Sequence, residues 1–548
     1  MKSILHVGVV IESPVPAAWV NQILQQIDAH HAMRLSVGLH DKHLHTTMKP
    51  AAKVQHALAD WLLENIIDIP QFTHNPEESE DLPAALDIHD LAASPDALAS
   101  CDVILSVMHQ QPPWHLLRGT VPVWSAGLPT MDVRIKHNLL DKAPFLWIHL
   151  WALQCTKGTD LVDSQRIASH ALPCQTYSIS DLRRLSYSAL PGVFMSRLVW
   201  LANRPDGALQ SIEIQNDNQG VFDTDRRQAL RDIGSSADVN SQVASIPALL
   251  MLFKVMKLLL RQLYERVHRK VFSEHWQLAV SHNPTSTSLH DIATLPVHAY
   301  TSLAEPDDVM WADPHLCEYQ DDVYVFFEKM HEHNENAHIA YARLNEQGTL
   351  IDSGLALAAE HHLSFPHVFT HEDNHYMIPE TASLRSVNLY KATRFPDQWV
   401  LQQTLLTDIN AADTVVFQHQ GRWWMFTNCQ SHHTVDERDE LHVYHAQKLE
   451  GPWHSHSLNP VLTGVDRSRM AGPVIHENGN LFRCSQYGAH RYGYGVNISR
   501  IDELTPDTYR ESASWRILPD KGAGWSGCHT FSRLGQLTII DRVRFSRR

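Results

Sequence analysis

Carboxylate side chains occur at matching points of a sequence unit that is repeated in the second half of the chain. Asp313 and Asp413 each follow an alanine at the start of one copy, and Glu380 ends the copy between them. Forming or breaking a glycosidic bond uses two carboxyl groups, one as general acid and one as base or nucleophile. The hypothesis is therefore that Asp313 is the base or nucleophile, Glu380 the acid, and Asp413 an orienting carboxylate.

The same repeat positions carry side chains suited to binding a sugar. Arginine can bind a phosphate or a uronate through two parallel hydrogen bonds. His315 and His367 are candidates for hydrogen bonds to sugar hydroxyls. The predicted substrate-binding residues are Trp311, His315, His367, Arg385, Arg469, Arg483, Gln486, His529, Asp541 and Arg542.

Structural roles are the alternative for these residues, and the sequence leaves them open. Asp313 and Asp413 could cap turns by accepting hydrogen bonds from backbone N–H groups. Glu380 could pair with Arg385, and the other arginines could pair with neighbouring acids. No cofactor and no metal is expected, because pairs such as His361-His362 and His432-His433 lack the spacing of known zinc sites.

The repeated unit consists of two strand-like segments joined by a polar turn, with alternating and aromatic residues typical of strands. The copies begin about 50–60 residues apart, which is the length of one β-propeller blade. Five copies predict a five-bladed propeller. They are Trp311–Glu328, Ser364–Glu380, Ala412–Phe426, Ala471–Gln486 and Cys528–Asp541.

A propeller brings the equivalent positions of its blades together, because the first strand of each blade surrounds the central axis. The starts of the first strands are predicted to converge at Asp313, Pro366, Asp413, Gly472 and His529. The ends of the second strands give a partly acidic set: Glu328, Glu380, Thr427, Gln486 and Asp541. A short segment, 275–280, is expected to complete the last blade and close the ring.

Several of these segments resemble glycoside hydrolase family 43 and its relatives, and more closely the propeller domain of the plant glucosamine inositolphosphorylceramide transferases. The matching segments span nearly all of residues 276–541. They include Ala312-Asp-Pro-His-Leu, Ser364-Phe-Pro-His-Val-Phe, Tyr376-Met-Ile-Pro-Glu-Thr381, Val387-Asn-Leu-Tyr390, Phe395-Pro-Asp-Gln-Trp399, Arg422-Trp-Trp-Met-Phe, Ala471-Gly-Pro-Val and Arg483-Cys-Ser-Gln486.

The resemblance to family 43 implies Asp313 as general base and Asp413 as the residue that tunes pKa and orientation. The family's general acid is a Glu before a Gly-Pro or Ala-Pro pair, but this chain has Ala471 there. That departure speaks against ordinary hydrolysis and makes Glu380 the substitute acid. In the plant proteins the propeller accompanies a separate glycosyltransferase domain, which has no evident counterpart in this sequence.

Residues 1–235 are predicted to form an α/β domain with a parallel sheet. Apolar runs at 4–11, 35–39, 102–106 and 121–124 indicate buried strands, and helical patterns at 20–27 and 54–67 lie between them. The segments around Cys101, Leu116 and Val121 resemble the N-terminal domain of formyltransferases. The family's catalytic His is missing beside Ser125-Ala-Gly-Leu-Pro129, so the resemblance implies the fold without its formyl-transfer site.

Residues 236–275 are predicted to be a connector that contains an amphipathic helix. Leu249, Leu252, Met256, Leu259, Leu263 and Val267 mark an apolar face at spacings of three and four. The opposite face is mostly basic. Packing between two domains is the favoured interpretation for the helix 248–270, with a peripheral membrane contact or a homo-oligomer contact as the alternatives.

Composition narrows the possible partners. The chain has 548 residues and a formal net charge of -16, which argues against binding a nucleic-acid backbone. Seven dispersed cysteines without a C-x-x-C pair suggest free thiols. The first residues lack a cleavage site and no stretch is long and apolar enough to span a bilayer, so a cytoplasmic location is expected.

Three functions are consistent with these features. The leading hypothesis is a carbohydrate-active enzyme, hydrolase-like or glycosyltransferase, that acts on a glycan or sugar nucleotide at the propeller rim in glycoconjugate biosynthesis. The second is a non-catalytic glycan-binding or scaffold protein, which the missing acid at Ala471 favours. The third is formyl or acyl transfer by the N-terminal domain, which the missing His disfavours.

Overall fold

The computed structural model describes residues 4–11, 16–39, 88–91, 94, 96–108, 121–128, 131–141, 143, 145–155, 161–173, 179–202, 248–282, 288–293, 295–303, 309–331, 336–429 and 439–547. The predicted helix at 54–67 and the predicted linker at 232–240 lie outside these residues. Within the chain, contacts divide Met1–Arg266 from Val267–Arg548.

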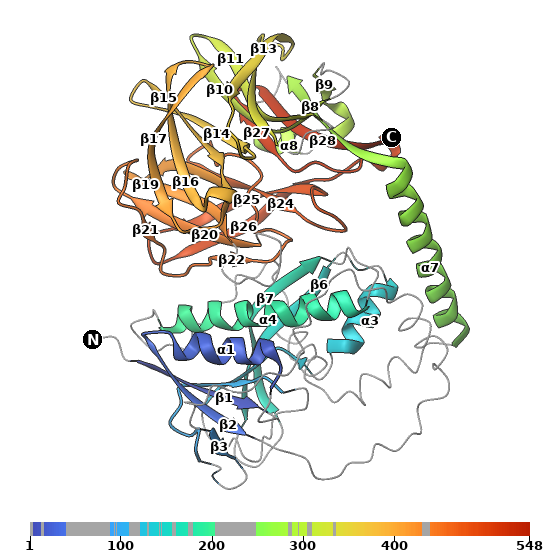
Figure 1. The fold of residues 1–548 in the computed structure, drawn as a ribbon, viewed down its shortest axis with the longest axis vertical. Helices are drawn as coiled ribbons and strands as arrows, with labels where there is room; N and C mark the ends of the chain where they lie inside the picture. The colour runs from blue at the N-terminus through green and yellow to red at the C-terminus, as the bar shows by residue number, and fades with distance from the viewer. Residues whose placement is uncertain are drawn as a thin grey trace. The chain divides into compact units, whose positions relative to one another are not determined.

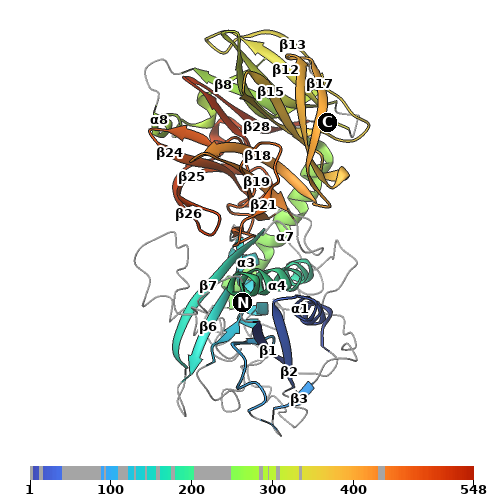
Figure 2. The same ribbon diagram turned by 90° about the vertical axis from the view of Figure 1, so that its left-hand side faces the viewer.

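The first unit contains one seven-stranded sheet in the order β3-β2-β1-β4-β5-β6-β7 (Figure 1). Neighbouring strands among β1 to β5 run parallel, whereas β6 and β7 form a long antiparallel hairpin at one edge, seen in Figure 2. The strands are β1 (Leu5–Ile11), β2 (Met33–Leu39), β3 (Ile88–Asp90), β4 (Val103–Ser106), β5 (Val123–Ser125), β6 (Phe145–Cys155) and β7 (Leu161–Pro173).

The sheet is therefore mixed, and the prediction of a parallel sheet was wrong for its last two strands. Among the described residues, the helices of this unit are α1 (Ala18–Asp28), α3 (Met131–Asp141), α4 (Ile179–Ala202) and most of α7 (Ala248–Val271). Trp19 and Ile23 of α1 are buried, and α1 contacts α4. The turn after β5 is held by Arg134 of α3, which donates hydrogen bonds to the carbonyls of Ala126 and Gly127.

The second unit is a five-bladed β-propeller, which confirms the prediction from the repeats (Figure 1). Blade 1 is β10 (Val309–Tyr319), β11 (Asp322–His331), β12 (His338–Leu344) and β13 (Leu350–Leu357). Blade 2 is β14 (Ser364–His371), β15 (Asn374–Glu380), β16 (Ser386–Arg394) and β17 (Gln398–Thr407).

Blade 3 is β18 (Ala411–His419), β19 (Arg422–Cys429), β20 (Glu440–Ala446) and β21 (His454–Ser455), with β22 (Leu462–Thr463) also paired to β20. Blade 4 is β23 (Ile475–Glu477), β24 (Asn480–Tyr487), β25 (Gly495–Leu504) and β26 (Tyr509–Ile517). Apolar clusters join neighbouring blades. Trp424 and Phe426 of blade 3, for example, pack with Leu481 and Tyr509 of blade 4.

The last blade combines both ends of the propeller sequence in the order β27-β28-β8-β9. These strands are β27 (Phe531–Leu534), β28 (Leu537–Arg547), β8 (Phe272–His282) and β9 (Thr301–Ser302). The antiparallel ladder between β28 and β8 runs from the Leu537–His282 pair to the Arg547–Phe272 pair. This confirms the predicted closure, which pairs strand edges that would otherwise be open.

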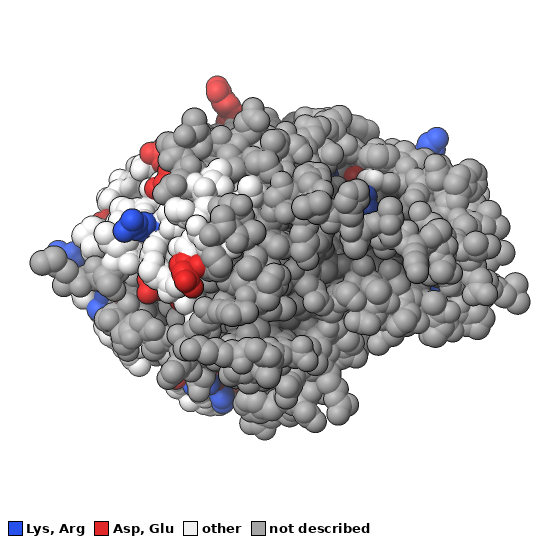
Figure 3. All heavy atoms as spheres, turned by 90° about the horizontal axis from the view of Figure 1, so that it is seen from below, with Lys and Arg blue, Asp and Glu red and all other residues white. Residues whose placement is uncertain are grey.

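Charged residues of both signs are interspersed on the face shown in Figure 3, and neither sign forms a continuous patch among the described residues. No helix in the described ranges is long and apolar enough to cross a membrane. The five cysteines whose side chains are described, Cys101, Cys317, Cys429, Cys484 and Cys528, are free and buried.

Candidate functional site

Three blades share an irregularity at the same point of their first strand. In β10, β14 and β18 the ladder with the second strand is interrupted for two residues. The first skipped residue has a positive φ in each case: 54° at Asp313, 42° at Phe365 and 49° at Asp413. The blade-2 equivalent is therefore Phe365 and not Pro366, since a proline ring locks φ near –65°.

The bulge positions the charged residues of the first and third blades. A left-handed residue inside a bulge turns its side chain away from the regular alternation of the strand. Gly472, in Ala471-Gly472-Pro473, has a φ of 137° and contributes no side chain, and its absent Cβ would meet the carbonyl oxygen of Phe531. The repeat therefore places carboxylates in blades 1 and 3 and none at the corresponding point of blade 4.

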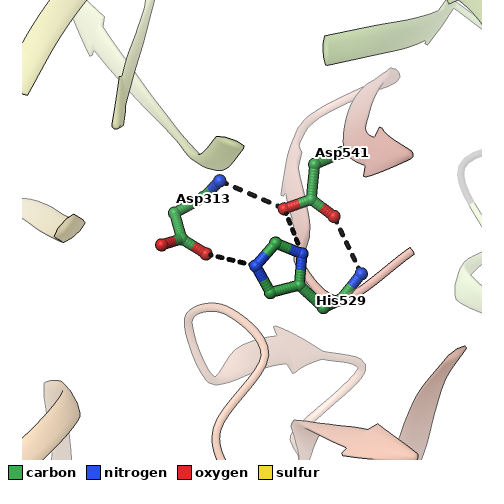
Figure 4. Close-up of side chains that lie close together, drawn as sticks. All are labelled: Asp313, His529 and Asp541. Atoms are coloured by element: carbon green, nitrogen blue, oxygen red, sulfur yellow. Dashed lines mark hydrogen bonds and ion pairs between the residues drawn. The ribbon is translucent and has the colours of Figure 1, made fainter. Parts of the chain in front are cut away.

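Asp313, His529 and Asp541 form a compact buried group (Figure 4). His529 lies between the two carboxylates, with Nε2 at 3.2 Å from Asp313 Oδ1 and Nδ1 at 2.8 Å from Asp541 Oδ2. Asp541 also accepts backbone N–H hydrogen bonds from Asp313 at 3.1 Å and from His529 at 2.8 Å. The group joins the first blade to the last one. It brings together Asp313 and His529, two of the predicted first-strand positions, and Asp541 from the predicted set of second-strand ends.

Burial disfavours both charges in this group, but ion pairing outweighs it. The charge of His529 and hydrogen bonds from His529 and Thr530 hold the pKa of Asp313 below its usual range despite burial. The negative charges of Asp541 and Asp313 raise the pKa of His529 well above its usual value, although burial opposes this. Asp313 is therefore ionised and His529 protonated at neutral pH.

Asp313 has further partners in two blades. Thr530 Oγ1 donates to its Oδ1 at 2.9 Å, and the Phe365 N–H donates to its Oδ2 at 3.3 Å. Its side chain is 9% exposed. Trp276 of β8 packs on His529 with ring centroids 4.3 Å apart, and Tyr492 meets the same ring edge-on.

Asp413 makes a second ion pair close by. Arg469 Nε donates to Asp413 Oδ2 at 2.6 Å, and the guanidinium lies 5.0 Å from the ring centroid of Tyr492. The side chain of Asp413 is 3% exposed and that of Arg469 is 23% exposed. The negative charge of Glu380 also acts on Arg469, which places these four residues in one neighbourhood.

Glu328 and Glu380 occupy equivalent places in blades 1 and 2. Glu328 pairs with Ala312 and Glu380 with Ser364, so each lies opposite the residue before the bulge. Burial raises the pKa of Glu328, His362 opposes the rise through an Nε2–Oε1 contact of 3.3 Å, and the charge of Asp313 adds to it. Glu328 was not assigned a role from the sequence, although its equivalence with Glu380 in the repeat was a usable signal.

His315 and His367 are too buried to bind a sugar in this structure, being 1% and 4% exposed. Nδ1 of His315 contacts the Pro366 carbonyl at 2.6 Å, and Nε2 of His367 contacts the Val416 carbonyl at 2.9 Å. Burial lowers the pKa of His315 to about 4 and that of His367 to about 3, so both rings are neutral. They link the first strands of consecutive blades.

Two of the predicted substrate-binding arginines make buried contacts within the propeller. Arg483 is fully buried, with its Nη2 and Nε each 2.7 Å from Glu511. Arg542 donates to the carbonyls of Val297 and Tyr300 and stacks on Trp525. Their guanidinium groups therefore belong to blade packing, which leaves Arg469 as the arginine of the set that lies among the carboxylates.

The remaining predicted residues also have structural contacts. Trp311 is 2% exposed and packs on Phe327 with ring centroids 4.5 Å apart. Gln486 is 4% exposed, and its backbone N–H donates to the Arg469 carbonyl at 2.7 Å. Arg385 donates to the Asp408 carbonyl at 3.1 Å. Arg385 is exposed and keeps further N–H donors, so its predicted role stays a prediction, whereas Trp311 and Gln486 are buried.

The group Asp313, His529 and Asp541 is also the one set of three potential ligands that the described residues bring within 4.8 Å of one another. Both ring nitrogens of His529 face carboxylates, so a cation bound to the ring would have to displace one of these contacts. The geometry therefore suits a buried ion network better than a metal site.

The protonated state of His529 predicts a pH-dependent stability. Because its pKa is raised on folding, its contribution is complete below the unfolded pKa near 6.5 and is lost as pH rises through the folded pKa. Above about pH 6.5, we expect His529 to make the free energy of unfolding fall by up to about 1.4 kcal/mol per pH unit. Urea unfolding of the wild type and of His529→Gln across this range measures it, and equal slopes in the two proteins would contradict it.

Residues 283–531 match a family model described as the N-terminal region of glucosamine inositolphosphorylceramide transferase 1. The chain is 33% identical over 204 residues to the protein of that name from Oryza sativa subsp. japonica, which covers 36% of this chain and 27% of the relative. It is 29% identical over 216 residues to the protein of that name from Arabidopsis thaliana, with coverage of 39% and 28%. The chain thus spans little more than a quarter of the length of these relatives.

Solved structures of carbohydrate-active proteins are also similar. A family 117 glycoside hydrolase from Zobellia galactanivorans has 12% identity and a TM-score of 0.32, covering 49% of this chain and 91% of that one. A β-1,2-mannobiose phosphorylase from Listeria innocua has 10% identity and a TM-score of 0.34, covering 48% and 96%. The propeller resemblance is confirmed by the sequence matches, whereas the formyltransferase resemblance of the first unit remains a prediction.

Proposed function

Because its propeller is related to the N-terminal region of the glucosamine inositolphosphorylceramide transferases, we propose that this chain acts on a glycosidic bond of a glycolipid or other glycoconjugate. The observation that carries the proposal is that Glu328 pairs across the strands with Ala312, next to Asp313. Ion pairing lowers the pKa of Asp313 despite its burial, whereas burial raises the pKa of Glu328. Two neighbouring carboxyl groups with pKa values pushed apart are the requirement for general base and general acid roles.

In the proposed mechanism Asp313 is the base or nucleophile. It is kept anionic by His529 and Thr530, and its bond to the Phe365 N–H fixes its direction. The base accepts the proton of the attacking hydroxyl, which comes from water in hydrolysis or from an acceptor alcohol in transfer. The acid gives a proton to the oxygen that leaves the sugar carbon.

Glu328 and Glu380 are the two candidates for the acid. Glu380 is the acid predicted from the sequence. Glu328 has a pKa that burial raises, and the negative charge of Asp313 raises it further. We therefore assign the acid to Glu328. Glu380 acts with Asp413 on the orientation of Arg469, whose side chain is partly exposed and can donate to a sugar or phosphoryl oxygen.

The acid assignment predicts a difference between two matched variants. Glu328→Gln is expected to lower turnover by about 100-fold, because Gln cannot donate the proton, and Glu380→Gln by about tenfold or less. The wild-type rate should fall as pH rises through the raised pKa of Glu328, and this alkaline limb should vanish in Glu328→Gln. pH–rate profiles of the three proteins measure both effects, and the reverse ranking would return the role to Glu380.

The proposal itself is tested by a search for turnover. The purified chain is incubated with sugar nucleotides and inositol phosphoceramide, and separately with aryl glycosides, and products are identified by mass spectrometry. Formation of a glycosylated lipid or release of a sugar supports it. Glycan binding without turnover would favour the scaffold alternative, which the missing acid at Ala471 continues to motivate. The absence of both turnover and glycan binding would refute the enzymatic proposal and the scaffold alternative.

The proposed partners are a glycan or sugar-nucleotide substrate and, by analogy with the names of the relatives, an inositol phosphoceramide acceptor. The cytoplasmic location expected from the dispersed cysteines remains a prediction, which fractionation of cells that express the chain would test. A role of the N-terminal unit in formyl or acyl transfer has no described feature in its favour.

A further inference from the structure

The helix α7 has an exposed apolar stripe that lies outside the proposed catalytic site. Six large side chains along it are between 46% and 65% exposed, and they follow one another mainly at spacings of three and four, so they lie on one side of the helix. Val255 and Leu258, on the other side, are 0% and 6% exposed. The stripe consists of Phe253, Met256, Leu260, Leu263, Tyr264 and Val267.

This arrangement differs from the one predicted from the sequence. Met256, Leu263 and Val267 belong to the predicted apolar face and are exposed, whereas Phe253, Leu260 and Tyr264 were not assigned to it. A contiguous row of exposed apolar side chains in a soluble protein marks an interaction surface. The side chains that flank the row indicate what kind of surface would cover it.

Most charged residues of the helix are basic. The sequence of α7 contains six Lys or Arg residues and one acid, Glu265, whereas the whole chain has a net charge of -16. Lys257 and Lys270 are exposed, and Lys254 and Arg261 are half-buried beside the stripe. The helix is therefore positively charged although the chain as a whole is negatively charged. An anionic partner is electrostatically complementary to it.

We propose that α7 binds the surface of an anionic lipid bilayer. Phe253, Leu260 and Leu263 would enter the boundary between headgroups and acyl chains, and the lysines beside them would face lipid phosphates. This is the pattern of interfacial amphipathic helices, which combine an apolar stripe with a Lys/Arg-rich polar face. In this proposal the helix lies along the surface of the bilayer.

A second copy of the helix is the competing occupant, because alternating spacings of three and four also suit a helix pair. In such a pair the residues flanking the seam face one another, and here they include Lys257 without an acidic counterpart. The sequence of α7 has one acid against six Lys or Arg residues, so two copies of the helix would repel each other. The charge pattern therefore favours a lipid surface, which is anionic throughout.

The test uses the full chain and vesicle sedimentation. Wild type is mixed with vesicles of phosphatidylcholine that contain phosphatidylserine, and separately with phosphatidylcholine alone. Sedimentation with the anionic vesicles is expected, and added salt should weaken it. Lys254→Glu with Lys257→Glu should reduce partitioning about tenfold or more, and Leu260→Glu with Leu263→Glu should abolish it.

A matched control substitutes exposed apolar residues elsewhere. Val400 and Leu401 of β17 are 48% and 54% exposed, so Val400→Glu with Leu401→Glu adds the same charges away from α7. This variant should sediment like the wild type, and circular dichroism checks that all variants are folded. Absent sedimentation of the wild type, or equal sedimentation of the α7 variants, would overturn the proposal. So would a dimer in light scattering that Leu260→Glu with Leu263→Glu converts to a monomer.

Discussion

Replacing Asp313 by asparagine is expected to reduce turnover on any substrate found for this chain by about 100-fold or more, while the propeller stays folded. The substitution keeps the size of the side chain and removes the negative charge that His529 and Thr530 stabilise. If Asp313 is the base or nucleophile, no other group in contact with it can take over, because Asp541 is already fully engaged in hydrogen bonds.

Stability must be separated from chemistry in this test. The new amide would place an N–H group against the Thr530 hydroxyl and His529, or against the Phe365 N–H, so the variant also loses a hydrogen bond. Thr530→Val is the matched control, because it removes the hydroxyl donor but leaves the carboxylate charge. We expect Thr530→Val to lose about 1–2 kcal/mol of unfolding free energy. Asp313→Asn should lose more, about 3–5 kcal/mol, because it also leaves the buried His529 without the carboxylate charge of Asp313. A large rate loss in Asp313→Asn alone would identify a chemical role, and equal rate losses would indicate a structural one.

The repeat made most of the propeller predictable from the sequence. Each blade buries alternate residues of short strands, so its hydrophobic pattern is local. The segment 275–280 was assigned to the last blade because that blade was short in the sequence, and it lies within β8 of that blade. The position of the bulge was harder to predict, because a residue with a positive φ does not change the alternation of polar and apolar residues in the sequence. The proline at position 366 showed where it could not lie, since φ of proline is fixed, and this alone would have moved the assignment to Phe365.

The sequence predicted which types of residue gather at the site, but not which side chains pair with one another there. The sequence identifies Asp313, Asp413 and His529 as neighbours because repeat positions converge. It does not reveal that His529 is held between two carboxylates, or that Glu511 neutralises Arg483, because these contacts depend on which side chains reach across a blade. The antiparallel hairpin of β6 and β7 was missed for a related reason, since strand direction is set by connections rather than by periodicity.

Replacing Arg483 by methionine is expected to destabilise the propeller by about 3–5 kcal/mol, the range for breaking one partner of a buried ion pair. Arg483 and Glu511 are 0% and 4% exposed in their side chains, and Arg483 also donates to the Arg467 carbonyl at 2.7 Å. Methionine would leave the Glu511 carboxylate buried with the hydroxyl of Tyr509 as its remaining described donor. Denaturant unfolding of the purified chain measures the loss.

The paired substitution shows whether the cost arises from the charge left behind. In the double variant Arg483→Met with Glu511→Leu no charge is buried, so most of the lost stability should return. The single variant should also respond to pH. The charge of Arg483 holds the pKa of Glu511 below its usual value of 4.5 despite burial, so in the wild type this pair contributes stability above that pH and loses it as the pH falls. Without Arg483, burial raises the pKa of Glu511, and acidification should narrow the gap between Arg483→Met and wild type. A double variant no more stable than the single one would show that the methionine packs badly and that the ion pair itself adds little.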